Sequence, residues 1–113
     1  MDTEDRIEKA IKDDVIAGIL PSVTFRRLLA SYPEATKSDL GSLFRSAFEN
    51  VDGAVWNIVI HWQAAKNNKD YDTWLDLQLI NELLKAGYEV NWSQAWVEEA
   101  WASIQNIVAP SGK

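Results

Sequence analysis

The stretch Ala-Val-Trp-Asn-Ile-Val-Ile-His-Trp-Gln-Ala-Ala, residues 54–65, is the most continuously apolar part of the chain. Wound as a helix at about 100° per residue, its apolar side chains point almost all the way around the axis, so the helix needs neighbours on most sides. The exception is a narrow polar stripe, where Asn57 and His61 fall on consecutive turns of one face. The stretch therefore predicts a central helix, about residues 53–67, surrounded by the other helices of a small bundle.

Residues 55–62 leave a second interpretation open, because their side chains also alternate. Trp56, Ile58, Ile60 and Trp62 would share one side of a strand, and the segment is rich in β-branched residues. We prefer the helix, because residues 63–67 extend the segment with helix-forming side chains and no partner strand is evident.

Apolar residues recur at helical spacing in five further segments. The expected helices cover residues 3–17, 22–31, 38–49, 72–86 and 93–108. Gly18 and Gly87 are typical helix stops, and Pro21 and Pro110 prevent a helix from continuing through them. A chain of 113 residues can bury one sizeable core but not two. We therefore expect residues 1–113 to form a single all-α domain, a compact bundle of about five to six short helices.

Composition and motifs exclude several functional classes. The chain has no cysteine and one histidine, so a metal site would have to be built from carboxylates, and the acidic segment 70–76 lacks the glycine and glutamate of an EF-hand loop. There is no Gly-rich phosphate loop, Gly-x-Ser-x-Gly or His-Glu-x-x-His motif. We expect no metal, no cofactor and no enzymatic activity. The acidic first residues do not resemble a secretory signal, and no apolar run could span a membrane, so a cytoplasmic location is the default.

The net charge of −6 is concentrated in the last third of the chain. Residues 1–69 hold ten acids against nine bases, whereas residues 70–112 hold seven acids against Lys85 alone. Such a field repels nucleic acid and anionic membranes and attracts basic partners. We therefore expect a basic protein partner, with neither direct nucleic-acid binding nor membrane binding.

The tryptophans divide into two groups. Periodicity places three of the six in the core: Trp56, Trp62 and Trp101. Trp74 projects onto the polar side of its helix, Trp92 precedes the last helix, and Trp96 lies at the margin of the last apolar stripe. Each of these rings either covers an edge of the core or serves as an interaction hot spot. Acids interspersed with such rings favour a surface that holds a basic protein. The predicted partner-binding residues are Asp70, Asp72, Trp74, Glu82, Trp92, Trp96, Glu98 and Glu99.

Asn57, His61 and Asp76 are candidates for a polar core or a pocket. His61 could serve as a general base oriented by Asn57, although a ring satisfied by Asn57 or by a backbone carbonyl is the simpler interpretation. Asp76 falls in the middle of the apolar arc of its predicted helix. It is therefore either buried and paired, for example with an arginine of the second or third helix, or it marks a gap in the core that faces a ligand.

These features favour a non-enzymatic inhibitor that neutralises a basic protein such as a nuclease toxin. In size, acidity and absence of catalytic motifs, the chain resembles bacterial immunity proteins and antitoxin-type inhibitors. This likeness is one of physical character and involves no sequence motif. Two alternatives stay open: a structural or adaptor protein that assembles with itself or another protein through an apolar groove, and a small ligand-binding or catalytic domain that uses His61.

Overall fold

Six α-helices, and no strand, are present in the part of the chain that the computed structural model describes, residues 3–62, 69–89 and 94–104. The helices are α1 (Thr3–Ile16), α2 (Pro21–Ser31), α3 (Lys37–Ala47), α4 (Ala54–His61), α5 (Lys69–Lys85) and α6 (Gln94–Ile104). The predicted all-α fold is thus confirmed, and so is the helix preferred over a strand for the apolar stretch. No helix among the described residues combines the length and the apolar character needed to cross a membrane.

Local sequence signals begin and end several of these helices. Pro21 opens α2, where its fixed backbone angle suits the first helical turn. Thr36 caps α3 in a capping box, in which its hydroxyl accepts the Asp39 N–H and the Asp39 carboxylate accepts the Thr36 N–H. α3 therefore begins at Lys37, one residue before the start expected at residue 38. Gly18 follows the end of α1 with a φ of 92°, a conformation that glycine adopts without strain.

The core lies where α1, α2, α3, α4 and α5 meet. Its centre is aromatic: the Phe25 ring packs edge-on against Phe44 at 6.2 Å and lies 6.0 Å from the Trp62 ring. All three side chains are fully buried. Aliphatic residues one turn apart on α1 and α5 close this core from both sides: Ile7, Ile11, Val15, Leu75, Leu79 and Leu83.

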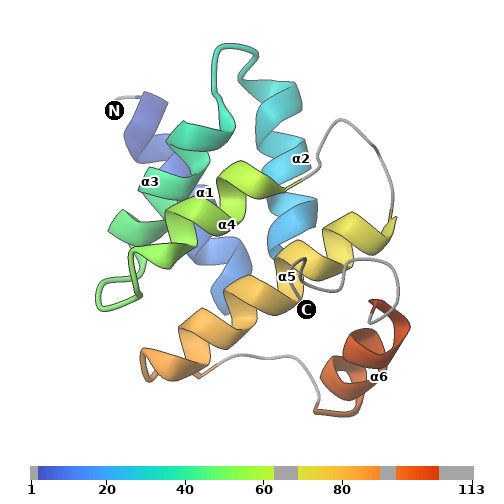
Figure 1. Ribbon diagram of the computed structural model, residues 1–113. Coiled ribbons are helices and arrows are strands. Elements are labelled where there is room, and N and C mark those ends of the chain that lie inside the picture. Colours follow the sequence, from blue (N-terminus) through green and yellow to red (C-terminus); the bar gives the residue numbers. More distant parts are fainter. Residues whose placement is uncertain (1–2, 63–68, 90–93, 105–113) are drawn as a thin grey trace.

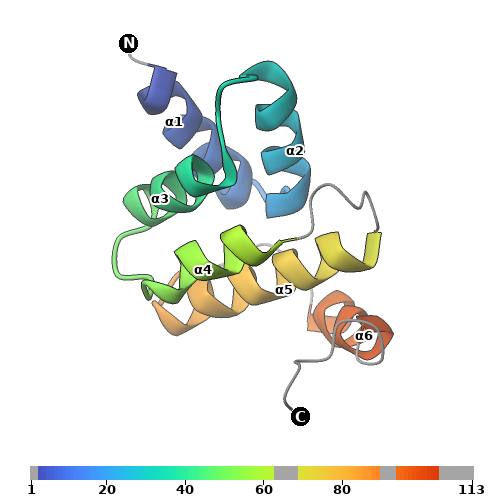
Figure 2. The ribbon, with the colours of Figure 1, turned by 45° about the horizontal axis from the view of Figure 1, so that its top comes forward.

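α4 is shorter than predicted and encloses less of the core. It ends at His61, because Trp62 has an extended backbone (φ −64°, ψ 131°), and Lys37 donates hydrogen bonds of 2.8 Å to the backbone carbonyls of Ile60 and Trp62. The predicted continuation of the helix lies outside the described residues. α4 packs on α3 and runs alongside α5 (Figure 2), which leaves a third side exposed to solvent.

The three tryptophans predicted for the core have different environments. Trp62 is fully buried, whereas Trp56 is 37% and Trp101 39% exposed. Trp56 lies on the side of α4 at the edge of α3, where its indole N–H donates to Ser38. Trp101 lies on α6, which sits at one end of the molecule beside α5 and away from α1 and α3 (Figure 1). The core prediction is correct for Trp62 and wrong for the other two, because too few helices surround them.

Candidate functional site

A cleft of about 580 Å³ lies between α2, α5 and α6. Its lining consists of Leu20, Ser22, Val23, Asp72, Thr73, Asp76, Trp96, Glu99 and Ala100. Four of these were candidate site residues from the sequence: Asp72, Asp76, Trp96 and Glu99. The volume falls within the range of about 300–1,000 Å³ that is common for ligand sites. The structure therefore brings these four acidic and aromatic candidates into one concave surface.

Helical spacing explains how these side chains come together. Asp72 and Asp76 are four residues apart on α5, and Trp96 and Glu99 are three apart on α6, so each pair shares one face of its helix. α6 is held against α5 by a small apolar cluster built on Leu77 and Ala100. This packing brings the α5 pair and the α6 pair into the lining of one cleft.

Asp76 forms part of the cleft wall and is only 2% exposed. Its carboxylate accepts the Ser22 backbone N–H at 2.7 Å and the Ser22 hydroxyl at 2.8 Å. Burial raises the pKa of Asp76 to about 7, against the lowering effect of both Ser22 hydrogen bonds, and the nearby charge of Asp72 adds to the increase. The expected burial of Asp76 is correct but the arginine partner is wrong. The first turn of α2 supplies a backbone N–H with no helical acceptor, and Asp76 satisfies it.

Asp72 borders the cleft and also holds three segments together. Arg26 of α2 donates to both of its carboxylate oxygens, at 2.8 and 2.7 Å, and the Trp62 indole N–H donates at 2.9 Å. The Arg26 guanidinium lies 5.1 Å from the centre of the Trp62 ring. Sequence reasoning did not find this cluster, because its three members lie in separate segments and share no motif.

Glu82, predicted for the binding surface, lies outside the cleft and is buried. One carboxylate oxygen accepts from Lys85 at 3.2 Å, and the other has no hydrogen-bond partner among the described residues. Glu82 shares a small hollow of about 180 Å³ with Asn50 and Asp52 of the α3–α4 loop. The exposed position predicted for Glu82 is therefore wrong, because this loop lies against the end of α5.

The remaining partner-binding candidates are spread over α5 and α6. Asp70 is half-buried at the start of α5, and Glu98 is exposed on α6 next to the cleft. Trp74 is half-buried and packs against both the main core and the α5–α6 cluster, so it covers an edge of the core. Trp92 lies outside the described residues.

Asn57 and His61 do not join Asp76. Both are exposed on the solvent side of α4, and His61 Nδ1 lies 2.8 Å from the backbone carbonyl oxygen of Asn57 one turn earlier. The three candidates for a polar core or a pocket therefore lie apart, and only Asp76 lines a cleft. The polar stripe of α4 marks its solvent face, and the simpler interpretation of His61 is the one the structure supports.

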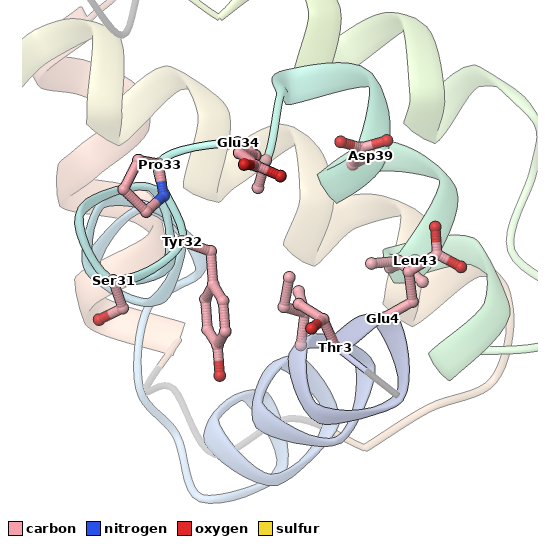
Figure 3. Close-up of a pocket in the computed structure, with 10 residues that line it drawn as sticks. Thr3, Glu4, Ser31, Tyr32, Pro33, Glu34, Asp39 and Leu43 are labelled. Atoms are coloured by element: carbon pink, nitrogen blue, oxygen red, sulfur yellow. The ribbon is translucent and has the colours of Figure 1, made fainter. Parts of the chain in front are cut away.

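A second hollow, of about 360 Å³, lies between the start of α1, the end of α2 and the start of α3. Figure 3 shows the Tyr32 ring as one wall, with Glu34 and Asp39 on another side and Glu4 beside them. Asp39 belongs to the capping box of α3, and Glu4 lies in the first turn of α1, where a helix favours negative charge. Two of the three acids thus have a role in the helices themselves. Sequence reasoning found no signal for this hollow, because its lining comes from three unrelated segments.

Among the described residues, no group of three or more His, Cys, Asp or Glu side chains is placed to hold a metal ion. Comparison of the chain with known protein families, with curated proteins and with solved structures found no match. The cleft between α2, α5 and α6 is therefore the feature on which a functional proposal depends.

Proposed function

We propose that this protein is a non-enzymatic binding module that holds a basic protein partner through the acidic, tryptophan-containing face of α5 and α6. The observation that supports the proposal is the lining of the cleft. The side chains of Asp72, Asp76 and Glu99 share it with the indole of Trp96, and no lysine or arginine is among the described residues that line it. Asp72 is already paired with Arg26 beside the cleft, whereas neither Asp76 nor Glu99 forms an ion pair with the described residues. A cleft of this kind is complementary to a cationic side chain with an apolar stem.

The surroundings of the cleft favour both the encounter with a basic surface and the contacts that follow inside the cleft. Glu98 and Glu99 are exposed on α6 and extend the negative field outward, which favours encounter with a basic surface. Inside the cleft, charges interact more strongly than on an open surface, because less water screens them. Trp96 is half-buried at the cleft wall, and partly enclosed aromatic rings are common binding hot spots.

A toxin that cleaves nucleic acid is the kind of partner that fits this surface best. Nucleases carry a basic cleft for the phosphates of their substrate, and an acidic protein that covers this cleft blocks the enzyme without any chemistry of its own. An immunity- or antitoxin-like role in the cytoplasm is therefore the form of the proposal that we favour.

The test is capture of a basic partner from the lysate of the source cell at low and high ionic strength, about 50 and 500 mM salt. The charge-reversal variant Glu98→Lys/Glu99→Lys alters the cleft side of α6. Its matched control is Glu4→Lys/Asp5→Lys, which changes two adjacent exposed acids of α1 by the same charge. We expect a basic protein that is captured at low salt, reduced at high salt and lost only with the α6 variant. Loss with the α1 variant instead, or capture that neither variant changes, would contradict the proposal.

One observation favours the adaptor alternative. Ile16, Ile19 and Val23 are exposed around the junction of α1 and α2, and Val23 borders the cleft. An apolar partner surface could pack there. A complex that forms equally well at both salt concentrations and survives the α6 charge reversal would support this alternative over the acidic-surface proposal.

A further inference from the structure

The Asp76 carboxyl group, in the wall of the cleft, has no cation in contact with it in the part of the chain that the structure describes. Among the described residues, the groups that touch the Asp76 carboxylate are the two donors of Ser22. The charged groups that line the cleft with it, among the described residues, are Asp72 on its own helix, which Arg26 of α2 already neutralises, and Glu99 on α6. None of the described residues thus places a positive charge directly against Asp76, and a cation that enters the cleft would supply one.

Ser22 can hold Asp76 in either protonation state. The backbone N–H of Ser22 donates to Oδ1 in both states, because it has no other role. The Ser22 hydroxyl donates to Oδ2 when Asp76 is ionised, and it can accept from Oδ2–H when Asp76 is protonated. A proton can thus leave or return without any rearrangement of the helices.

The protein already contains one example of the cation that such a cleft would suit. Arg26 forms a bidentate pair with Asp72 while it lies over the Trp62 ring. A guanidinium allows this arrangement because it is planar, binds a carboxylate through two N–H groups and stacks on an indole. On α6, Glu99 and Trp96 offer a second carboxylate and indole on one helix face, at the cleft.

Building on the proposed function, we propose that the cleft binds one arginine side chain of the partner, and that entry of its guanidinium displaces a proton from Asp76 to the solvent. The ionised Asp76 carboxylate and the guanidinium then face each other in the cleft. Glu99 and Trp96 bind the guanidinium from the α6 side. Partner binding is consequently linked to pH, because the protonated and the arginine-bound states of Asp76 exclude each other.

The pKa of Asp76 determines how strongly the affinity for arginine changes with pH. Burial raises its pKa to about 7, so at pH 5 the empty cleft is almost fully protonated and at pH 8 almost fully ionised. Where binding requires the ionised form, arginine affinity rises with pH and becomes constant above pH 7. The limit is about 100-fold between pH 5 and pH 8, because about two pH units separate pH 5 from the pKa.

The experiment uses the full chain and a defined probe, arginine capped as N-acetyl-arginine-N-methylamide, with capped citrulline as the uncharged isostere. Affinity is followed by NMR titration at pH 5 and pH 8, and proton release by calorimetry at pH 6 in two buffers of different ionisation enthalpy. We expect binding of arginine but not citrulline, tighter binding at pH 8 by up to about 100-fold, and release of close to one proton per arginine at pH 6.

Two variants distinguish the effect of the Asp76 proton from the effect of the Glu99 charge. Asp76→Asn keeps both Ser22 contacts, because its carbonyl accepts the N–H and its amide donates to the hydroxyl, so arginine binding should become weak and independent of pH. Glu99→Gln, at an exposed position with no hydrogen bond or ion pair to the described residues, should weaken binding at both pH values and keep the pH dependence. Glu34→Gln, at the second hollow, is the control and should change neither.

The inference fails if capped arginine does not bind, if it binds equally at pH 5 and pH 8, or if Asp76→Asn retains the pH dependence. These outcomes are distinct from failure of the proposed function. A basic partner captured through α6, together with pH-independent arginine binding, would leave the function standing and remove the proton exchange. Proton-linked arginine binding without any basic protein partner would support the proton exchange and contradict the proposed function.

Discussion

Replacement of Asp76 with asparagine should change how the stability of this protein depends on pH. The asparagine side chain would occupy nearly the same volume as the protonated aspartic acid and keep both contacts to Ser22. The substitution therefore removes one ionisation from the core with little change in packing. Any difference in pH dependence between the two proteins then reports on the protonation of Asp76 itself.

The magnitude follows from the shift in pKa. In the unfolded chain Asp76 has its ordinary pKa of 3.8, and in the folded protein the pKa is about 7. Between these values the folded protein holds a proton that the unfolded chain has lost, so stability falls as the pH rises. The stabilisation is complete below about pH 4 and absent above about pH 7. Three pKa units correspond to about 4 kcal/mol, of which about 2.5 kcal/mol is lost between pH 5 and pH 8.

Urea unfolding at pH 5, 6, 7 and 8 measures this loss. The quantity of interest is the unfolding free energy of the wild type minus that of Asp76→Asn, because titrations common to both proteins cancel. We expect this difference to decrease by about 2.5 kcal/mol from pH 5 to pH 8. Asp5→Asn, at an exposed position of α1, is the control for loss of a carboxylate outside the core. A difference for Asp76→Asn that stays constant or increases with pH would show that the folded protein holds no extra proton on Asp76 and would refute the reasoning.

Three further predictions concern packing and polar contacts, and each is measured as a change in the unfolding free energy. Gly41→Ala should destabilise by about 1–3 kcal/mol, because its Cβ would lie 3.1 Å from a side-chain atom and 3.3 Å from a backbone atom of α4. Gly53→Ala is the matched control and should change stability by less than about 1 kcal/mol, since the nearest atoms would be 3.9 Å away; an equal loss in both would refute the close approach of α3 and α4. Arg26→Gln should cost about 1–3 kcal/mol, because it leaves the Asp72 carboxylate without its bidentate partner, and a neutral result would show that this cluster is dispensable. Glu82→Met should be neutral or stabilise by about 1 kcal/mol, because it removes a buried carboxylate oxygen that has no partner among the described residues, whereas a large loss would mean that a further donor satisfies it.

The helices could be predicted from the sequence because their signals are local. Apolar spacing and stop residues located all six, and Gly18 and Gly87 each take the positive φ that a helix-ending glycine requires. The extent and burial of α4 could not be predicted in the same way. An all-round apolar segment does not reveal how many neighbours it will have, and Lys37, at the start of α3, helps to end it.

The candidate site was predictable only in part, because it also depends on contacts between distant segments of the chain. Asp76 stood out because a carboxylate in an apolar arc requires an explanation, and it proved to be both buried and at a cleft. Its partner, Ser22, lies 54 positions away and has no feature that marks it in the sequence. Trp96 and Glu99 were predicted for one binding surface with no relation to Asp76, and the packing of α6 on α5 brings them into the cleft that Asp76 lines. Residue types and their periodicity thus supplied the components of the cleft, and tertiary packing assembled them.

The environment of Asp76 has two linked consequences, a stability that depends on pH and an arginine affinity that depends on pH. At pH 8 the unbound protein carries a buried charge whose loss of hydration Ser22 offsets only in part, which is why the pKa is raised. A guanidinium in the cleft would interact favourably with the same charge. Binding would therefore recover free energy that the folded, unbound protein loses at this pH. If the stability shift is observed without pH-linked arginine binding, Asp76 serves only to hold the start of α2 through Ser22. If both are observed, the lowered stability of the empty cleft at neutral pH and its affinity for a basic partner have a single physical cause.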